Sequence, residues 1–197
     1  MGVPAILTWQ DSFGRSRLQI ILSVRNDDTG WVRFPREGST YQVLDGDREV
    51  ASRTYFALPA VIGPGETAFL VDTLGAPGVE LRRGLTAVSD VVAVPTDRPT
   101  FALSITDLRL TSGLGGALRA TGEVRNDSES TTGQVVAGAI ALDRDGAPLA
   151  VVFDTFDVGR LDPGATRAFV TDTQPGGPPV IDGTVSVVVG VAFDVGP

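Results

Sequence analysis

The 197-residue chain contains no cysteine, no histidine and no lysine, so all 16 of its basic residues are arginine. These absences exclude disulfides, thiolate and imidazole nucleophiles, most transition-metal sites and Schiff-base chemistry. The formal net charge of −8 argues against a nucleic-acid partner, because phosphate binding requires clustered basic side chains. We therefore predict a protein that is not an enzyme, with no catalytic residues, no cofactor and no metal site.

The remaining composition is typical of a folded chain. Hydrophobic residues make up 42% and charged residues 20%, which suffices for a packed core. The chain lacks the run of about eighteen apolar residues that spans a membrane, so we predict no membrane insertion by this segment. Its first residues also lack the basic region and apolar run of a signal peptide.

Strand and turn signals alternate about every ten residues along the first half of the chain, without helical periodicity. The apolar run at residues 18–24 predicts a strand. Asn26 ends that strand, because its side-chain amide can hydrogen-bond the following backbone and shape a turn. Phe69 begins a later strand and is expected to face the core. Asp-Gly at 45–46 predicts a tight hairpin, Pro-Gly at 64–65 predicts a type II turn, and a further turn is predicted at 75–78.

The second half of the chain repeats the first. Val-Arg-Asn-Asp occupies residues 24–27 and returns at 124–127. Further matches follow at nearly the same offset along the rest of the chain, and together they indicate a tandem duplication. At the same offset, or with a slip of one residue, Asp-Gly at 45–46 matches 145–146, Phe69 matches Phe169, and Pro-Gly at 64–65 matches 163–164.

The repeat divides the chain into two predicted domains, residues 1–97 and 98–197, joined through the Pro-containing connection at 95–100. In the second copy, strands are predicted at residues 118–124, 135–142 and 184–193. Short strands separated by Gly and Pro turns predict an all-β fold, with two tandem immunoglobulin-like antiparallel β-sandwiches.

Three motifs of the second copy resemble the FxLYD family of bacterial immunoglobulin-like domains. They are Gly-Glu-Val-Arg-Asn at 122–126, Ile-Ala-Leu-Asp-Arg-Asp-Gly at 140–146 and Leu-Asp-Pro-Gly-Ala-Thr-Arg-Ala-Phe at 161–169. The family's tyrosine is missing between Leu142 and Asp143, and Ile140 stands where the family has phenylalanine. The first copy matches less well, and adhesion-type repeats with similar Asn and Pro-Gly positions are the alternative. The resemblance implies a non-catalytic module of secreted, lipid-anchored or cell-wall proteins.

Two acidic segments are candidates for calcium. Asp143 and Asp145 are spaced like the opening of a calcium loop, but Ala147 stands where a further oxygen ligand is needed, and a hairpin turn is the alternative. A calcium site at the domain junction, built from Asp97 and loop carboxylates, is the second candidate.

Aromatic residues offer two candidate surfaces, and core packing is the alternative for both. A sugar-stacking platform would use the aromatic residues concentrated in the first copy, namely Trp9, Trp31, Phe34, Tyr41 and Tyr55. A protein-contact surface would use Trp31, Arg33, Phe34 and Arg36, because Trp and Arg are enriched at binding hot spots.

We therefore predict a non-catalytic structural or protein-interaction module at the cell surface or outside the cell, which spaces or docks its neighbours. Its partner is a protein or neighbouring copies of itself, joined through exposed edge strands. The alternative is a carbohydrate-binding module that uses the aromatics of the first domain, with a glycan as the partner.

Overall fold

The computed structural model describes residues 2–11, 13–75, 84–99, 102–112, 117–153, 158–171, 178 and 187–194. Over these residues the chain contains no helix, and its strands pair antiparallel. The chain forms two compact units, Met1–Arg98 and Pro99–Pro197. The predicted all-β, sandwich-type architecture is confirmed.

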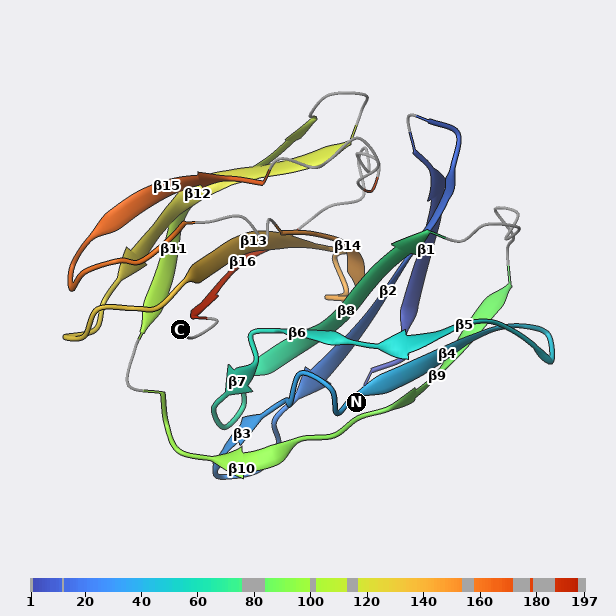
Figure 1. Cartoon of the computed structure of the whole chain (residues 1–197), viewed down its shortest axis with the longest axis horizontal. Helices are drawn as coiled ribbons and strands as arrows, with labels where there is room; N and C mark the ends of the chain where they lie inside the picture. Colours follow the sequence, from blue (N-terminus) through green and yellow to red (C-terminus); the bar gives the residue numbers. More distant parts are fainter. Residues whose placement is uncertain are drawn as a thin grey trace. The chain divides into compact units, whose positions relative to one another are not determined.

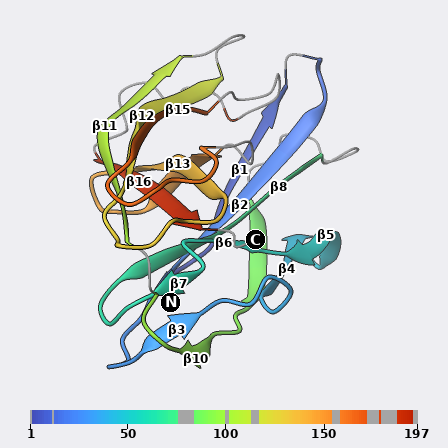
Figure 2. The same cartoon turned by 60° about the vertical axis from the view of Figure 1, so that its left-hand side comes forward.

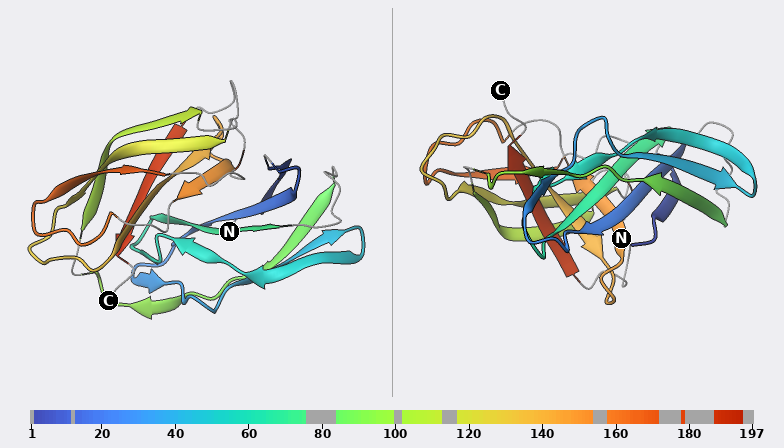
Figure 3. Two further views of the ribbon diagram at one scale, coloured as in Figure 1. Left: turned by 45° about the horizontal axis from the view of Figure 1, so that its top comes forward. Right: turned by 90° about the horizontal axis from the view of Figure 1, so that it is seen from below.

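The first unit contains two layers of short strands (Figure 1). Its strands are β1 (Ala5–Gln10), β2 (Ser16–Arg25), β3 (Trp31–Arg33), β4 (Thr40–Asp45), β5 (Arg48–Thr54), β6 (Phe56–Leu58), β7 (Val61–Ile62), β8 (Thr67–Gly75), β9 (Leu85–Asp90) and β10 (Val94–Thr96). One sheet has the order β1-β2-β8-β6. The other layer comprises β5-β4-β9 and β10-β3-β7, and Figure 3 (left) draws β4, β5 and β9 as neighbouring blue, cyan and light-green arrows.

The core of the first unit lies between these layers. Leu18, Ile20 and Leu22 alternate along β2 and are fully buried, as the period of two requires. They meet the buried side chains of Tyr41 and Val43 from β4. Burial of such a side chain contributes about 1.5–3 kcal/mol to the free energy of unfolding.

The second unit repeats this connectivity in its described strands (Figure 2). They are β11 (Leu103–Ser112), β12 (Leu118–Asn126), β13 (Val135–Leu142), β14 (Pro148–Phe153), β15 (Thr166–Val170) and β16 (Val187–Asp194). The order β11-β12-β15 corresponds to β1-β2-β8 of the first unit, and β14-β13-β16 corresponds to β5-β4-β9. Strand β13 is buried along its whole length.

The predicted turns form as their residue types require. Gly65 adopts a φ of 76° and Gly164 one of 73°, and each turn is closed by a backbone hydrogen bond, Glu66 N to Gly63 O at 3.2 Å and Ala165 N to Asp162 O at 2.9 Å. These are type II turns, as predicted. Gly46 has a φ of 61° in the two-residue hairpin between β4 and β5. Phe69 and Phe169 are both buried, as predicted.

A buried asparagine connects two loops in each unit. The Nδ2 of Asn26 donates to Gly30 O at 2.8 Å and Ile62 O at 3.4 Å, while its Oδ1 accepts from Asp28 N at 3.1 Å. Asn126 does the same in the second unit. There the distances are 2.8 Å to Ser130 O, 3.0 Å to Leu161 O and 3.0 Å from Ser128 N.

The connection predicted at 95–100 is shorter than expected, because Val94–Thr96 forms strand β10 and pairs with Trp31–Arg33. A proline is tolerated there, since β10 is an edge strand. The turn predicted at 75–78 lies outside the described residues from 76 onward. The strand predicted at 184–193 is described as Val187–Asp194, and residues 184–186 lie outside.

Candidate functional site

The predicted contact segment is divided between core and surface. The Phe34 side chain is 3% exposed and belongs to the hydrophobic core, while its backbone N donates to Ala60 O at 2.8 Å. Strand β3 ends at Arg33, and the next side chain, Phe34, points into the core. The contact-surface prediction was wrong for Phe34, and the surface is reduced to Trp31, Arg33 and Arg36.

Trp31 is half-buried and has neighbours on two sides. The Arg98 guanidinium lies 5.8 Å from its ring centroid. A Cβ atom added to Gly63 would lie 3.0 Å from the Trp31 ring, so the indole covers the turn at Gly63 closely. Arg33 and Arg36 are exposed. Trp31 thus has a packing role in its own unit, and the two arginines remain available to a partner.

The other aromatic residues of the predicted sugar-stacking platform, Trp9, Tyr41 and Tyr55, are buried and do not present such a platform. The rings of Tyr41 and Tyr55 lie 4.8 Å apart. Tyr41 Oη donates to Asp72 Oδ2 at 2.6 Å, and the hydroxyls of Tyr55 and Ser89 share a hydrogen bond of 2.7 Å. Burial raises the pKa of both tyrosines, and for Tyr41 the Asp72 carboxylate raises it further. Trp9 is also buried.

The candidate calcium loop is a hairpin turn. Asp143 Oδ1 accepts hydrogen bonds from the backbone N of Asp145 at 2.9 Å and of Ala147 at 2.8 Å. Gly146 has a φ of 81° and donates to Asp143 O at 3.1 Å. Among the described residues, which include Asp97, there is no cluster of acidic side chains that could hold a metal ion.

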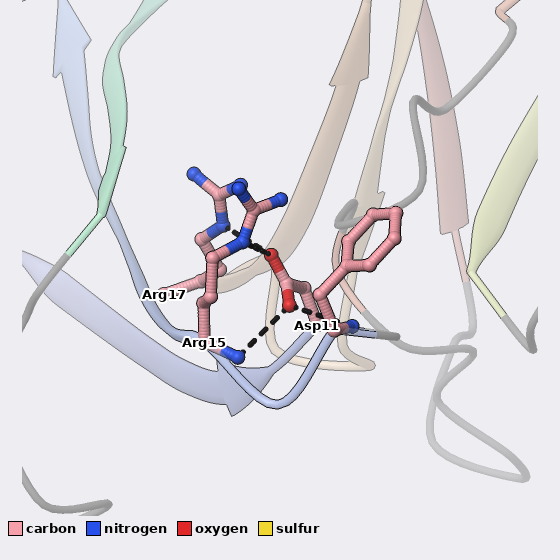
Figure 4. Close-up of polar contacts among 4 residues, drawn as sticks. Asp11, Arg15 and Arg17 are labelled. Carbon is pink, nitrogen blue, oxygen red and sulfur yellow. Dashed lines mark hydrogen bonds and ion pairs between the residues drawn. The ribbon is translucent and has the colours of Figure 1, made fainter.

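The loop between β1 and β2 is organised by one buried carboxylate (Figure 4). Asp11 Oδ1 accepts hydrogen bonds from the backbone N of Phe13 and of Arg15, both at 2.9 Å. Its Oδ2 accepts from Arg15 Nε at 2.8 Å and Arg17 Nε at 3.0 Å, so both guanidinium groups converge on one oxygen. Gly14, at a φ of 71°, closes the turn by donating to Asp11 O at 2.8 Å.

These contacts control the ionisation of Asp11. Burial of the carboxyl group favours its neutral form, but the backbone hydrogen bonds from Arg15 and Phe13 and the guanidinium hydrogen bonds outweigh burial. Together they lower the pKa of Asp11 to about 2. The carboxylate is therefore charged at any physiological pH and holds the two arginines in place.

An exposed aromatic ring lies at the tip of this hairpin. The Phe13 side chain is 66% exposed, and the Arg15 guanidinium lies 4.8 Å from its ring centroid. The sequence patterns alone did not predict a site at these residues. The available signal was the residue content of the segment that joins the first two strands, which includes Asp11, Phe13 and Arg15 here and reads Gly-Leu-Gly-Gly-Ala at 113–117 in the second half of the chain.

The sheet β5-β4-β9 has two contrasting edges. Edge strand β5 carries Arg48, Glu49 and Arg53, all exposed, and such charges hinder the addition of another strand. Edge strand β9 reads Leu-Thr-Ala-Val-Ser-Asp, and its Val88 side chain is 58% exposed. No described strand pairs with β9 on the side away from β4. Alternate residues of β9 therefore have backbone groups at this edge that no described strand pairs.

Comparisons with known proteins yield little. No family model matches the chain, and no curated protein matches it. Among solved structures, a calcium-binding mutant of Bacteroides uniformis beta-glucuronidase 2 aligns with 14% identity and a TM-score of 0.23, over 89% of this chain and 24% of that one. At this TM-score the likeness carries no argument about function. The described part of the chain contains no helix that is long and apolar enough to cross a membrane.

Proposed function

We propose that the chain is a non-catalytic structural and protein-interaction module of a cell-surface or secreted bacterial protein, and that neighbouring copies join through the edge of β9. The resemblance to FxLYD-type domains supports the cellular setting. The observation that carries the mode of assembly is the β9 edge, which has an exposed Val88 near its centre and a single charged residue, Asp90, at its end, on a sheet whose opposite edge carries three charged residues.

The residues of β9 suit pairing with a second copy of themselves. In an antiparallel pair centred on Val88, this side chain lies opposite Val88 of the second copy, and each covers the other's exposed apolar surface. Thr86 then lies opposite Asp90 of the second copy, so the two Asp90 carboxylates do not face each other. The two identical patches form an isologous contact that closes as a two-fold dimer.

Salt has a defined effect on this contact. Each copy carries a formal charge of −8, and this repulsion opposes association at low ionic strength. Salt screens it over a Debye length of about 10 Å at 0.1 M. Hydrogen bonds between paired strands are much less sensitive to screening, so association strengthens as salt is added.

Sedimentation velocity on two single variants tests this proposal. Val88→Lys places a charge on the β9 edge, whereas Ser52→Lys places the same charge at an exposed position of β5, which is already charged. We expect the wild type and Ser52→Lys to dimerise at high salt and Val88→Lys to remain monomeric. A monomeric wild type, or a Val88→Lys variant that dimerises as well as Ser52→Lys, would contradict the proposal.

A further inference from the structure

The β1–β2 tip presents two guanidinium groups in a fixed arrangement. Arg15 and Arg17 each use Nε to bind the same oxygen of Asp11. Their terminal amino groups have no hydrogen-bond acceptor among the described residues. The Asp11 side chain is fully buried, whereas those of Arg15 and Arg17 are 59% and 26% exposed. The terminal amino groups can therefore donate outward without a further ordering of the loop.

The charge and shape of the tip define what it can bind. Two guanidinium groups share one carboxylate, which leaves a local excess of one positive charge on an acidic chain. The exposed Phe13 ring lies against Arg15 and adds an apolar surface. The planar guanidinium fork matches the two oxygens of a carboxylate. We propose that this tip binds a peptide segment of a partner protein in which an acidic residue lies next to an apolar one.

The rest of the chain favours a short acidic peptide over a polyanion. The net charge of −8 repels an extended anionic surface, such as a lipid bilayer or a nucleic acid. A single carboxylate is recognised within hydrogen-bond distance, where the fixed arginines outweigh the distant acidic residues. The Asp11 contacts order the loop before the partner arrives, so binding costs little conformational entropy.

Fluorescence anisotropy with a matched pair of labelled peptides tests this site. One peptide alternates Glu with Leu, and its twin has Gln in place of every Glu. We expect the full-length chain at low salt to bind the Glu peptide with a Kd below about 1 mM and the Gln twin at least about tenfold more weakly. The double change Arg15→Gln and Arg17→Gln abolishes this difference. Phe13→Ser weakens binding of the Glu peptide severalfold and leaves the Asp11 contacts intact.

Arg53→Gln is the control, because it removes an exposed arginine from β5 of the same unit and should change nothing. Equal affinity for the two peptides, no binding of the Glu peptide, or binding that survives both the arginine changes and Phe13→Ser would overturn the proposal. Binding to phosphatidylglycerol vesicles that depends on Phe13 and Arg15 while the peptide is ignored would also overturn it. Peptide binding weakens with salt and is insensitive to Val88→Lys, which separates it from the assembly of copies through β9.

Discussion

Both units use the same buried asparagine, the same Pro-Gly turn and the same strand connectivity, yet the sequences that join their first two strands differ. In the first unit Asp11 organises this hairpin and Phe13 is exposed at its tip. In the second unit Thr111 lies within β11, opposite Arg119 of β12, and the sequence at 113–117 is Gly-Leu-Gly-Gly-Ala, without an acidic, basic or aromatic residue. The shared residues are explained by the fold alone. The residues that differ are therefore the better candidates for binding.

The two units also differ at the strands β9 and β16, which are edge strands of the sheets β5-β4-β9 and β14-β13-β16. In the second unit β11 runs close alongside β16, whereas β1 only touches β9 in the first. The backbone edge of β9 is therefore the more accessible of the two. For this reason we propose the edge of β9, and not that of β16, as the docking edge.

The largest effect on stability is expected at the buried asparagine that both units share. Asn26→Ala removes three side-chain hydrogen bonds and Asn126→Ala removes four, and each change leaves two backbone carbonyl groups without this partner. We expect each change to cost about 3 kcal/mol of opening free energy in its own unit. Hydrogen exchange of the amides in β2 and β12 measures both costs. If one unit tolerates its substitution while the other does not, the two asparagines are not equivalent.

Substitution of one glycine in each unit is expected to have a smaller effect on stability, and the size of this effect should differ between the units. A Cβ at Gly122 would lie 2.9 Å from the Phe169 ring and 3.1 Å from the backbone oxygen of Thr106, and neither can easily move. A Cβ at Gly63 would meet the half-buried Trp31 ring, which can shift. We expect Gly122→Ala to cost about 2 kcal/mol and Gly63→Ala about 1 kcal/mol. Urea unfolding of each variant gives the order, and a reversed order would show that Trp31 is held more rigidly than Phe169.

The smallest stability effect concerns the tip of the first unit and depends on pH. The pKa of Asp11 is lowered in the folded chain to about 2 from 3.8, so its carboxylate stabilises the fold above about pH 4, and this contribution is lost as pH falls through about 2. Asp11→Asn should therefore lower Tm at pH 6, and its difference from the wild type should shrink toward pH 2. Thermal unfolding across this range measures it. A difference that is constant with pH would show that the Asp11 charge does not stabilise the hairpin.

Local residue types predicted the turns and the strands between them. Pro64-Gly65 shapes its own turn, and Asn26 shapes the turn that follows it through Asp28 N and Gly30 O, so a short stretch of sequence was sufficient to predict both turns. The bond from Asn26 to Ile62 O is long-range and was not predicted. Strand β10 was missed because Pro95 normally ends a strand, and its place at an edge depends on the tertiary fold. The hairpin tip was missed because Asp11 and Arg17 meet only after β1 and β2 pair. The exposure of Val88 likewise requires knowing that β9 lies at the edge.

The central claim, that copies join through β9, is tested most directly by cross-linking. The chain has no natural cysteine, so Val88→Cys introduces a single thiol at the centre of the proposed pair, where facing Cβ atoms lie about 4.5–5.5 Å apart. Ser52→Cys places the control thiol on β5. Under mild oxidation at high salt we expect Val88→Cys chains to form disulfide-linked dimers rapidly and Ser52→Cys chains to remain monomeric. Equal or slower cross-linking by Val88→Cys would contradict assembly through the β9 edge.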